Sequence, residues 1–446
     1  MSRYFGTDGI RGKAEMFTGE FLERIVRGLD VGNKRVLIGG DTRESTKHIL
    51  ENLELSLINN GAREIGNIGV FPTPGLNYVM YSLVYDYAID VTASHNPYTD
   101  NGIKIFKYTD DGGIKLDEEE RERIEQLLED DAPLNLFEPH EETMVYDEKE
   151  RALQYYAKHL MAGFGEKADL AGLKIALDCA NGATGIISER AFRKLRADIT
   201  IINNDVTFGR KINDGVGSTH IEGLQALVRN GDFDFGAAFD GDGDRCILVD
   251  ESGAIVDGDQ ILAIIAKHFG LARLVTTVMA NQGLLNWGAS NGVEISMTDV
   301  GDQNVSQEMR AHDIKLGGEQ SGHIILPGEA MGDGVLTALT VARIMKETGK
   351  TLSELAREMK KLPQVLVNLP VTDEEKAKLA GSEAAQEVTA RYSEKLEKVR
   401  GRVLVRPSGT ENLIRITMWG EEQDVINMLA DELADELKEA LRNGND

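Results

Sequence analysis

Short apolar runs rich in β-branched residues recur along the chain, and each is followed by a turn of Gly, Asn or Asp and then by an amphipathic stretch. Three such openings begin with the runs at 35–38, 173–177 and 275–279. Their alternation with helical stretches predicts α/β layers with mostly parallel strands. The openings are irregularly spaced, which indicates related domains rather than a solenoid.

Breaks in this pattern divide the chain into four parts. The acidic run 117–131 predicts a helix with a solvated face, and a polar connector follows it before a new helix near Glu148. A turn at 250–253 and the end of a predicted helix at 352–361 give the other two breaks. We therefore expect domains at residues 1–146, 147–251, 252–363 and 364–446.

The last of these parts differs in character from the other three. Strands are predicted at 365–371, 402–405 and 413–419, with a charged helix at 373–397 and a final helix at 422–442. This order predicts a small α+β domain, whereas the first three parts are predicted to be α/β domains.

Length and charge limit the possible functions. The chain of 446 residues is too long for one ordinary core, and its 49 Lys and Arg against 75 Asp and Glu give a net charge of -26. That charge repels nucleic acid and anionic membranes. No apolar signal core opens the sequence, and Cys179 and Cys246 do not form a disulfide or metal-binding pattern. We expect a soluble, cytoplasmic protein with two buried cysteines that binds neither nucleic acid nor membrane.

The six residues 240–245 read Asp-Gly-Asp-Gly-Asp-Arg and lie between two apolar runs that predict buried strands. In an extended loop the side chains at i, i+2 and i+4 point the same way, and the glycines let the backbone wrap closely. Asp240, Asp242 and Asp244 can therefore surround one small cation. Carboxylate oxygens are hard ligands, which favours Mg²⁺ or Ca²⁺ over zinc.

Other interpretations of this run stay open at the level of sequence. The spacing also fits an EF-hand loop ending at Glu251, although Arg245 stands where that loop needs glycine and the flanks predict strands. Aspartyl-phosphate chemistry is a second possibility, with Asp240 as nucleophile and Asp242 as acid and base. The third is a solvated acidic turn.

A polar loop after the predicted strand 87–91 contains Ser94 and Lys104. The Asn-Pro and Asn-Gly pairs in it mark sharp turns, so we expect Ser94 to be presented rather than buried. A turn serine that bonds its own backbone is the simpler interpretation. Because no Gly-x-Ser-x-Gly elbow surrounds Ser94, acyl chemistry is not indicated, and the hydroxyl could instead carry phosphate.

Two further loops combine glycines with polar side chains. Residues 317–323 place Glu319, Ser321 and His323 between glycines, a combination suited to gripping sugar hydroxyls and moving a proton, although a lone loop histidine often has no such role. The run 406–411 reads Arg-Pro-Ser-Gly-Thr-Glu between two predicted strands. It predicts an oxyanion cradle, and it lacks the pattern of a Walker loop.

In this order, these motifs and the amino-terminal Gly-Thr-Asp-Gly-Ile-Arg-Gly at 6–12 resemble the α-D-phosphohexomutase superfamily over nearly the whole chain. Within it, the amino-terminal motif and the loop 317–323, with its Gln320, are similar to the phosphoglucosamine mutase family. The resemblance implies a heart-shaped four-domain fold, with three related α/β domains and a smaller carboxy-terminal α+β domain.

The resemblance also implies a role for each motif. Ser94 would be phosphorylated in the active enzyme and would bind one Mg²⁺ together with Asp240, Asp242 and Asp244. Arg11, Lys104, Arg245 and His323 would surround the reacting oxygens, with Lys104 as the first candidate for acid and base and His323 as the second. The contacts to sugar hydroxyls and to the phosphate that stays in place would come from Glu319, Ser321, Arg406, Ser408, Gly409, Thr410 and Arg415.

The implied activity is that of an isomerase that interconverts glucosamine 6-phosphate and glucosamine 1-phosphate. The phosphoryl group would pass through a phosphoserine enzyme and a hexosamine 1,6-bisphosphate, which also serves as activator. A phosphomannomutase/phosphoglucomutase is the alternative, and a phosphatase using Asp240 or an inactive sugar-phosphate sensor would compete with both. A small phosphosugar is the expected partner, and a homodimer is left open.

Overall fold

The computed structural model of this chain divides into two units. The first comprises residues 1–277 and 296–357, and the second comprises residues 278–295 and 358–446. The residues that the structure describes are 3–6, 8–110, 112–130, 132, 134, 142–164, 169–398, 400–408 and 412–443.

An eight-stranded sheet begins the first unit. Its order is β1-β2-β6-β5-β3-β4-β8, with β7 paired to β6. The strands are β1 (Phe5–Gly6), β2 (Gly9–Lys13), β3 (Arg35–Gly40), β4 (Glu64–Val70), β5 (Tyr87–Val91), β6 (Asp100–Thr109), β7 (Gly112–Lys115) and β8 (Met144–Asp147). The accompanying helices are α1 (Gly19–Leu29), α2 (Thr46–Asn59), α3 (Thr73–Leu83) and α4 (Glu118–Glu129). The capping box of Asp117 and Glu120 begins α4, so the acidic helix expected at 117–131 is confirmed.

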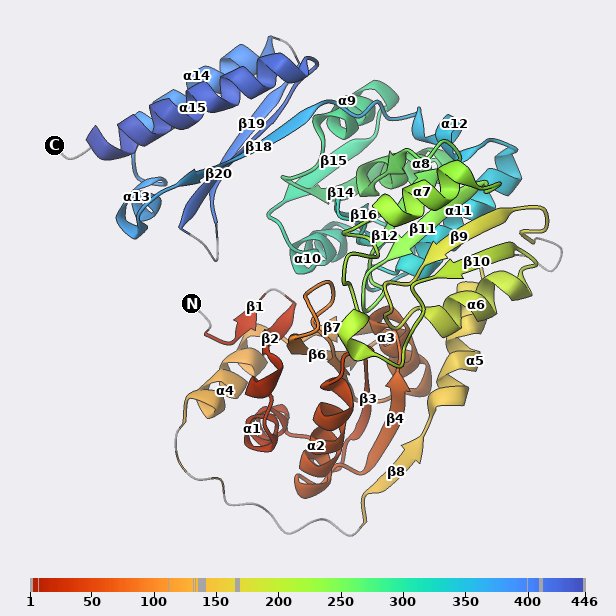
Figure 1. Cartoon of the computed structure of the whole chain (residues 1–446). Coiled ribbons are helices and arrows are strands. Elements are labelled where there is room, and N and C mark those ends of the chain that lie inside the picture. The colour runs from red at the N-terminus through yellow and green to blue at the C-terminus, as the bar shows by residue number, and fades with distance from the viewer. Residues whose placement is uncertain are drawn as a thin grey trace. The chain divides into compact units, whose positions relative to one another are not determined.

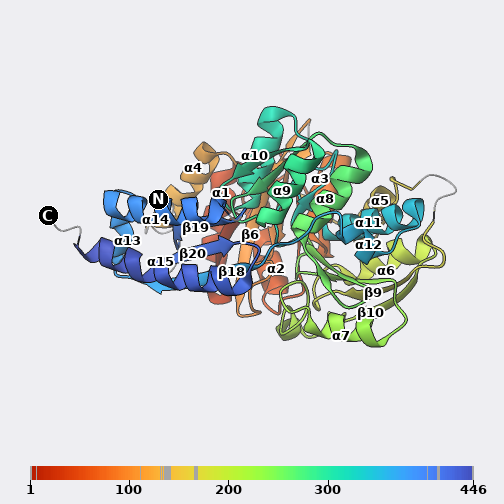
Figure 2. The same cartoon turned by 90° about the horizontal axis from the view of Figure 1, so that it is seen from above.

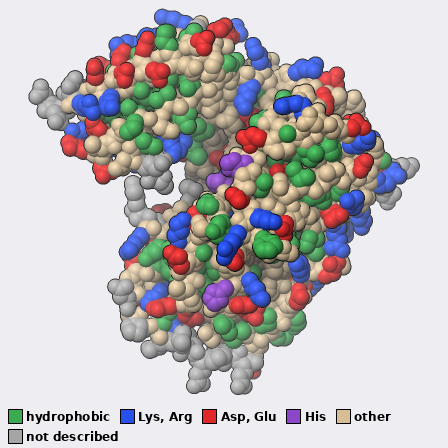
Figure 3. All heavy atoms as spheres, viewed as in Figure 1, with side chains coloured by type: hydrophobic (Ala, Val, Ile, Leu, Met, Phe, Trp, Pro, Cys, Tyr) green, Lys and Arg blue, Asp and Glu red, His purple; other side chains and the backbone are tan. Residues whose placement is uncertain are grey.

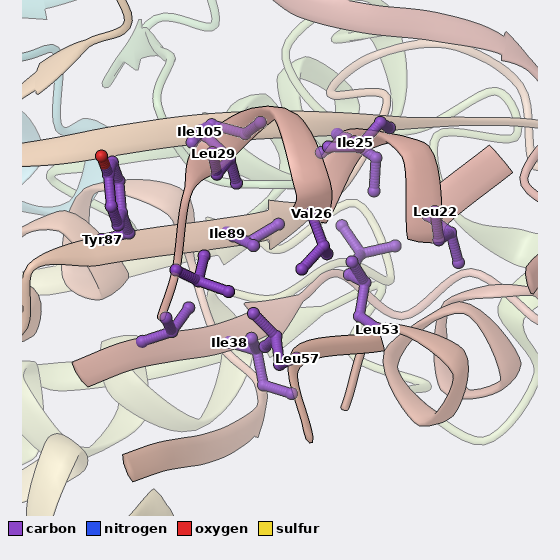
Figure 4. Packing of buried hydrophobic residues seen from close by; sticks show 14 of the residues in the cluster. Leu22, Ile25, Val26, Leu29, Ile38, Leu53, Leu57, Tyr87, Ile89 and Ile105 are labelled. Carbon is purple, nitrogen blue, oxygen red and sulfur yellow. The ribbon is translucent and has the colours of Figure 1, made fainter. Parts of the chain in front are cut away.

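Helix α1 shows why this segment is helical. Leu22, Ile25, Val26 and Leu29 recur at helical spacing and are buried, and the Thr18 side chain caps the first turn by accepting from Phe21 N. These side chains pack against residues of α2, β3, β5 and β6 in one cluster, as Figure 4 shows. Burial of each large aliphatic side chain contributes roughly 1.5–3 kcal/mol. The cluster holds this face of the sheet, and the carboxyl ends of β3 and β5 are thereby fixed.

Two further sheets follow in the chain. The second has the order β10-β9-β11-β12-β13, and the third β15-β14-β16-β17. Their strands are β9 (Lys174–Asp178), β10 (Asp198–Ile202), β11 (Phe235–Phe239), β12 (Cys246–Asp250), β13 (Ile255–Val256), β14 (Arg273–Thr277), β15 (Glu294–Thr298), β16 (Gly317–Gly318) and β17 (Ile324–Ile325). The helices between and after them are α5 (Lys149–Leu160), α6 (Gly185–Lys194), α7 (Glu222–Asn230), α8 (Gly258–Phe269), α9 (Gln282–Asn291), α10 (Asp302–His312), α11 (Gly334–Thr348) and α12 (Leu352–Ala356).

The expectation of mostly parallel strands is wrong. In the first sheet β3 pairs with β4 and β5 in parallel, but β5 and β6 are antiparallel, and in the second sheet β11 and β12 form an antiparallel pair. The reason is that short polar loops, such as 240–245, join neighbouring strands directly instead of through a crossover helix. One such hairpin carries the acidic triplet.

In the second unit, β18 (Gln364–Pro370), β20 (Leu413–Trp419) and β19 (Arg402–Pro407) form an antiparallel sheet in that order. Helices α14 (Glu383–Glu397) and α15 (Gln423–Asn443) run along one face of it in both views (Figures 1 and 2). The single helix expected at 373–397 is in fact two, α13 (Asp373–Lys378) and α14, because the chain turns at 379–382 and Ser382 caps α14. The helix expected at 352–361 ends at Ala356.

The surface and the cysteines complete the description. Acidic and basic side chains mingle over the face seen in Figure 3. Cys179 and Cys246 are free and buried, as expected. Within the described part of the chain, no helix combines the length and the apolar character needed to cross a bilayer.

Candidate active site

The acidic triplet lies on the loop of the β11–β12 hairpin. Phe239 and Cys246 are register partners, so residues 240–245 form the whole connection. Asp240, Asp242 and Asp244 are buried, and each offers one oxygen within 4.8 Å of the others. Glu251, which an EF-hand would use as a ligand, accepts instead from Ser353 Oγ at 2.6 Å. The strand flanks and this contact exclude the EF-hand.

The electrostatics of the triplet fit a cation. Burial, with Asp244 and Asp242 nearby, raises the pKa of Asp240 well above its usual value. Among the described residues, the Oδ1 atoms of Asp242 and Asp244 are buried and have no hydrogen-bond partner. Buried carboxylate oxygens without partners are costly, and a hard divalent ion would satisfy them. The residues present therefore fit the divalent metal that the sequence predicts.

Ser94 lies against this triplet. Its Oγ donates to Asp240 Oδ2 at 2.7 Å, and its backbone has φ 51°, in the left-handed region. The expectation that Ser94 is presented to solvent is wrong, because the residue is only 1% exposed. Gly241 explains how the two loops approach, since a Cβ at that position would lie 2.8 Å from the Ser94 carbonyl oxygen.

Lys104 also reaches the triplet, but from a strand. It lies on β6 rather than in a polar loop, because residues 100–109 continue the sheet by pairing with β5 and β2. Its Nζ lies 2.7 Å from Asp242 and 3.0 Å from Asp244. Burial alone would lower the pKa of Lys104, but Asp242, Asp244 and Asp8 together raise it well above its usual value. The side chain is a buried ammonium ion.

Alternating charges continue from Lys104 to Asp302. Asp8 lies 2.9 Å from Lys104, 2.5 Å from Arg11 and 2.6 Å from Lys115, and Lys115 lies 2.5 Å from Asp302. Burial would raise the pKa of Asp8, yet these three cations hold it well below its usual value.

The sequence singled out Arg11, Lys104 and His323, but not Asp8, Lys115 or Asp302. Asp8 was within reach because it stands in the same glycine motif, but nothing in the sequence marks Lys115. The chain of charges ends at Asp302, whose Oδ2 lies 3.9 Å from His323 Nε2.

The loop 317–323 brings a second set of groups to the triplet. His323 forms a backbone bridge with Arg245, and the two imidazole nitrogens are buried without hydrogen-bond partners among the described residues. Burial would lower the pKa of Arg245, but Asp240 and Asp244 raise it. Glu319 is almost buried and accepts from Gly301 N at 3.2 Å, whereas Ser321 is exposed. A cavity of about 290 Å³ opens beside His323.

Behind the triplet, Thr73 holds Asp242 in place. Its hydroxyl lies 2.9 Å from Asp242 Oδ2 and also contacts Asp90 Oδ2. Burial raises the pKa of Asp90 well above its usual value, and the charge of Asp242 adds to this rise. The hydrogen bond from Thr73 acts in the opposite direction. This support comes from α3 and β5, and no motif in the sequence announces it.

The predicted oxyanion cradle lies in the second unit. Arg406 and Arg415 are register partners on β19 and β20, and Ser408 N closes the intervening loop by donating to Leu413 O at 2.8 Å. Burial, together with the neighbouring Arg415, lowers the pKa of Arg406. Arg406 Nε and Ser408 Oγ have no hydrogen-bond partner in the described chain. Gly409 and Thr410 lie outside the described residues, so their part in the cradle stays a prediction.

Comparison with known proteins adds independent evidence. Models of the three alpha/beta/alpha domains and the C-terminal domain of phosphoglucomutase/phosphomannomutase match residues 2–134, 154–253, 257–362 and 366–436. The chain is similar over 99% of its length to a phosphoglucomutase/phosphomannomutase family protein from Burkholderia thailandensis, with a TM-score of 0.78, 21% identity and 98% of that chain covered. It is also similar to the Aspergillus fumigatus N-acetylphosphoglucosamine mutase solved with GlcNAc-6P and magnesium, with a TM-score of 0.68, 19% identity and 98% and 96% of the two chains covered. These structural likenesses establish the fold.

Curated relatives are more similar in sequence. Phosphoglucosamine mutases from Bacillus cytotoxicus and Geobacillus thermodenitrificans are 43% and 44% identical to the chain. Each match covers 98% of this chain and 99% of the relative. The chain therefore belongs to the phosphoglucosamine mutase family, within the phosphoglucomutase/phosphomannomutase proteins.

Proposed function

We propose that the chain interconverts glucosamine 6-phosphate and glucosamine 1-phosphate, with Ser94 as the residue that carries the phosphoryl group. The observation that carries this proposal is the 2.7 Å contact between Ser94 Oγ and Asp240, inside a buried triplet of carboxylates. A hydroxyl so placed can be esterified beside a cation. The phosphoryl group passes from Ser94 to the free hydroxyl of the substrate, and the resulting hexosamine 1,6-bisphosphate returns its other phosphate to the serine. The same bisphosphate would serve as activator.

Asp240, Asp242 and Asp244, with the phosphate of Ser94, would hold one Mg²⁺. When bound, this ion neutralises charge on the transferring phosphoryl group. Asp240 would then be ionised, because a positive charge among the three carboxylates opposes the burial that raises its pKa.

The protein's own cations act on the same charge. Lys104 is buried beside the triplet, Arg245 is half-buried next to Asp244, and Arg11 is connected to the triplet through Asp8 and Lys104. Fixed positive groups in a water-poor site stabilise a spreading negative charge without reorganising. The raised pKa keeps Lys104 protonated, and it would serve as a proton donor once a cation on Asp242 and Asp244 brings that pKa down. His323, whose nitrogens have no partners within the described chain, is the candidate that can accept a proton.

Glu319 and Ser321 would contact the sugar hydroxyls. Arg406, Ser408, Gly409, Thr410 and Arg415 would bind the phosphate that is not transferred. A cradle that recognises phosphate, and not a particular carbon, lets one site accept the bisphosphate in both orientations. This is what a mutase needs and a simple phosphatase does not.

The test measures initial rates on glucosamine, glucose and mannose 6-phosphates, each with Mg²⁺ and its bisphosphate. We expect a strong preference for the amino sugar, and peptide mass spectrometry should find the trapped phosphate on Ser94. Equal rates on the three sugars would favour a phosphomannomutase/phosphoglucomutase. Phosphate on Asp240 would favour a phosphatase, and binding without turnover would favour a sensor.

A further inference from the structure

Arg43 lies directly beneath the Ser94 loop and is completely buried, yet no part of the proposed chemistry uses it. The residue follows β3, whose end is joined to the end of β5 by the hydrogen bond from Asp41 N to Val91 O at 3.1 Å. The Ser94 loop leaves the sheet at the end of β5. Arg43 therefore stands on the neighbouring strand end and faces the loop.

All five N–H groups of the Arg43 guanidinium are used. Nη2 donates to the carbonyl oxygens of Ser94 and Asn96, both at 2.8 Å. Nη1 donates to the carbonyl oxygens of Pro97 and Asp100. The fifth donor, Nε, bonds Asp41 Oδ2 at 2.9 Å. One side chain thus holds four carbonyl groups spread over the loop 94–100, and the planar five-donor geometry this requires is available only to arginine.

Asp41 completes this support. It balances the buried charge of Arg43, and its Oδ2 also accepts from Thr92 Oγ1 at 2.7 Å. Thr92 Oγ1 in turn accepts from Ser94 N at 2.9 Å. Both backbone groups of Ser94 are therefore tied to the same pair of side chains, directly or through one hydroxyl.

A second residue approaches from another domain of the same unit. Asn213 Nδ2 donates to the Ser94 carbonyl oxygen at 2.8 Å and to the Asn96 carbonyl oxygen at 3.3 Å. The Ser94 carbonyl thus has two strong donors. This matters because Ser94 is held at φ 51°, a strained conformation for a residue with a side chain, which persists only when the surroundings impose it.

We infer that Arg43, assisted by Asn213, is a positioning residue for the phosphoryl-carrying serine. It holds Ser94 in the left-handed conformation that directs Oγ at the acidic triplet, and it does not touch substrate. The inference rests on the proposed function, in which Ser94 is phosphorylated. Transfer needs in-line placement within a fraction of an ångström, so loss of this support should lower the rate of transfer and leave substrate binding nearly unchanged.

The experiment compares Arg43→Lys with Arg35→Lys. Arg35 is a matched control because its guanidinium also bonds a carboxylate, Glu64, and two carbonyl oxygens, but at the start of β3 and outside the Ser94 loop. The readouts are the rate at which glucose 1,6-bisphosphate phosphorylates Ser94, followed by peptide mass spectrometry, and kcat and KM with glucosamine 6-phosphate. Both rates are divided by the concentration of folded protein, and a thermal melt gives the folded fraction.

We expect Arg43→Lys to lower both the phosphorylation rate and kcat about 100-fold while KM changes less than about threefold. Arg35→Lys should keep kcat within about twofold even if it melts earlier. An Arg43→Lys protein that matches the Arg35→Lys protein in both rates overturns the inference. If Ser94 of the wild type is phosphorylated in that case, the proposed function stands. If Ser94 of the wild type is not phosphorylated, the proposed function and the inference both fail.

If Arg43→Lys does not fold, the variant Asn213→Gly tests the same inference. Asn213 has φ 56°, so glycine keeps its backbone conformation while removing the donor. Asn33→Gly, at φ 57° in a remote turn, is the control. We expect kcat of Asn213→Gly to fall about tenfold at constant KM. Wild-type kcat in this variant overturns the inference.

Discussion

The Ser94 site of the first unit and the Arg406 cradle of the second surround a cationic side chain differently: the first with opposite charges and the second with a like charge. In the first, Lys104 lies within 3.0 Å of three carboxylates, and each pKa shift there reflects a charge partner as well as burial. In the second, Arg406 stands directly opposite Arg415, and like charge and burial together lower its pKa.

The difference shows what each region is prepared for. A network of paired charges is rigid and is organised before substrate arrives, which suits the step where bonds change. A pair of facing guanidiniums is costly by itself and becomes favourable only when an anion lies between them. In the proposed function, the first arrangement would serve catalysis and the second would serve binding of a phosphate. The following changes test this contrast, from the largest expected effect to the smallest.

Ser94→Ala should have the largest effect. Without the hydroxyl no phosphoserine forms, so turnover should fall by at least about 10³-fold even with bisphosphate supplied. Binding of glucosamine 6-phosphate, measured by calorimetry, should persist because the cradle is intact. Ser56→Ala, which removes another buried serine from the first domain, is the control. Appreciable residual turnover would contradict the mechanism.

Asp242→Asn should come next. This carboxylate contacts Lys104 and Thr73 and offers one buried oxygen without a partner in the described chain. Loss of its charge should remove the response to Mg²⁺ and lower the rate about 10²–10³-fold. The rise in melting temperature that Mg²⁺ gives the wild type should disappear with it. In the control Asp232→Asn, which changes an exposed carboxylate, Mg²⁺ should still raise both the rate and the melting temperature. If Asp242→Asn still depends on Mg²⁺, the three carboxylates do not hold one ion together.

Arg406→Met tests the cradle. Removal of one of two facing guanidiniums should raise KM about 10–100-fold and leave kcat within about threefold. Without ligand, the variant should be as stable as the wild type or more stable by about 0.2–1 kcal/mol, because like-charge repulsion is relieved. Arg391, which pairs with Glu436 on the surface of the same unit, supplies the control Arg391→Met. A lower kcat at constant KM would make Arg406 part of the chemistry instead.

Asp333→Asn should have the smallest effect. It tests what burial does to the pKa of a carboxyl group that has no cation paired with it in the described contacts. Asp333 is buried, caps α11 and accepts from Tyr156 at 2.7 Å, and burial raises its pKa to about 6. The folded protein thus binds this proton more tightly than the unfolded chain does, so the carboxyl stabilises below about pH 4 and loses that contribution as pH rises through about 6.

Asparagine keeps the cap and carries no charge. The variant should therefore melt about 2–4 °C above the wild type at pH 7 and close to it at pH 4. The measurement is a pair of thermal melts at the two pH values. A constant difference across this range would mean that Asp333 does not titrate between them.

The sequence singled out the residues of both regions better than it predicted their placement. The acidic triplet, Ser94 and the strands around them follow from local patterns, because alternating carboxylates and glycines between two apolar runs bring three hard ligands onto one short loop. The sequence singles out Lys104 but predicts a loop around it, because the strand β6 begins with polar residues that resemble a turn.

What could not be predicted depends on contacts between distant segments. The carbonyl oxygen of Ser94 is bound by Arg43 and Asn213, which lie 51 and 119 positions away in the chain. Lys115 and Asp302 are likewise 187 positions apart. Neither residue stands in a motif, and only the folded sheets bring such partners together. The boundaries of the four domains stay predictions from composition.

Gly241 has a consequence for how such an enzyme can change. The loop 240–245 approaches the backbone of Ser94 at this residue, because a Cβ there would lie 2.8 Å from the Ser94 carbonyl oxygen. If the proposed function holds, substitutions in the loop 317–323 can alter which hexose is accepted while this backbone approach stays the same. New substrate preferences would arise around an unchanged centre, and alteration of residue 241 would stop turnover of every sugar alike.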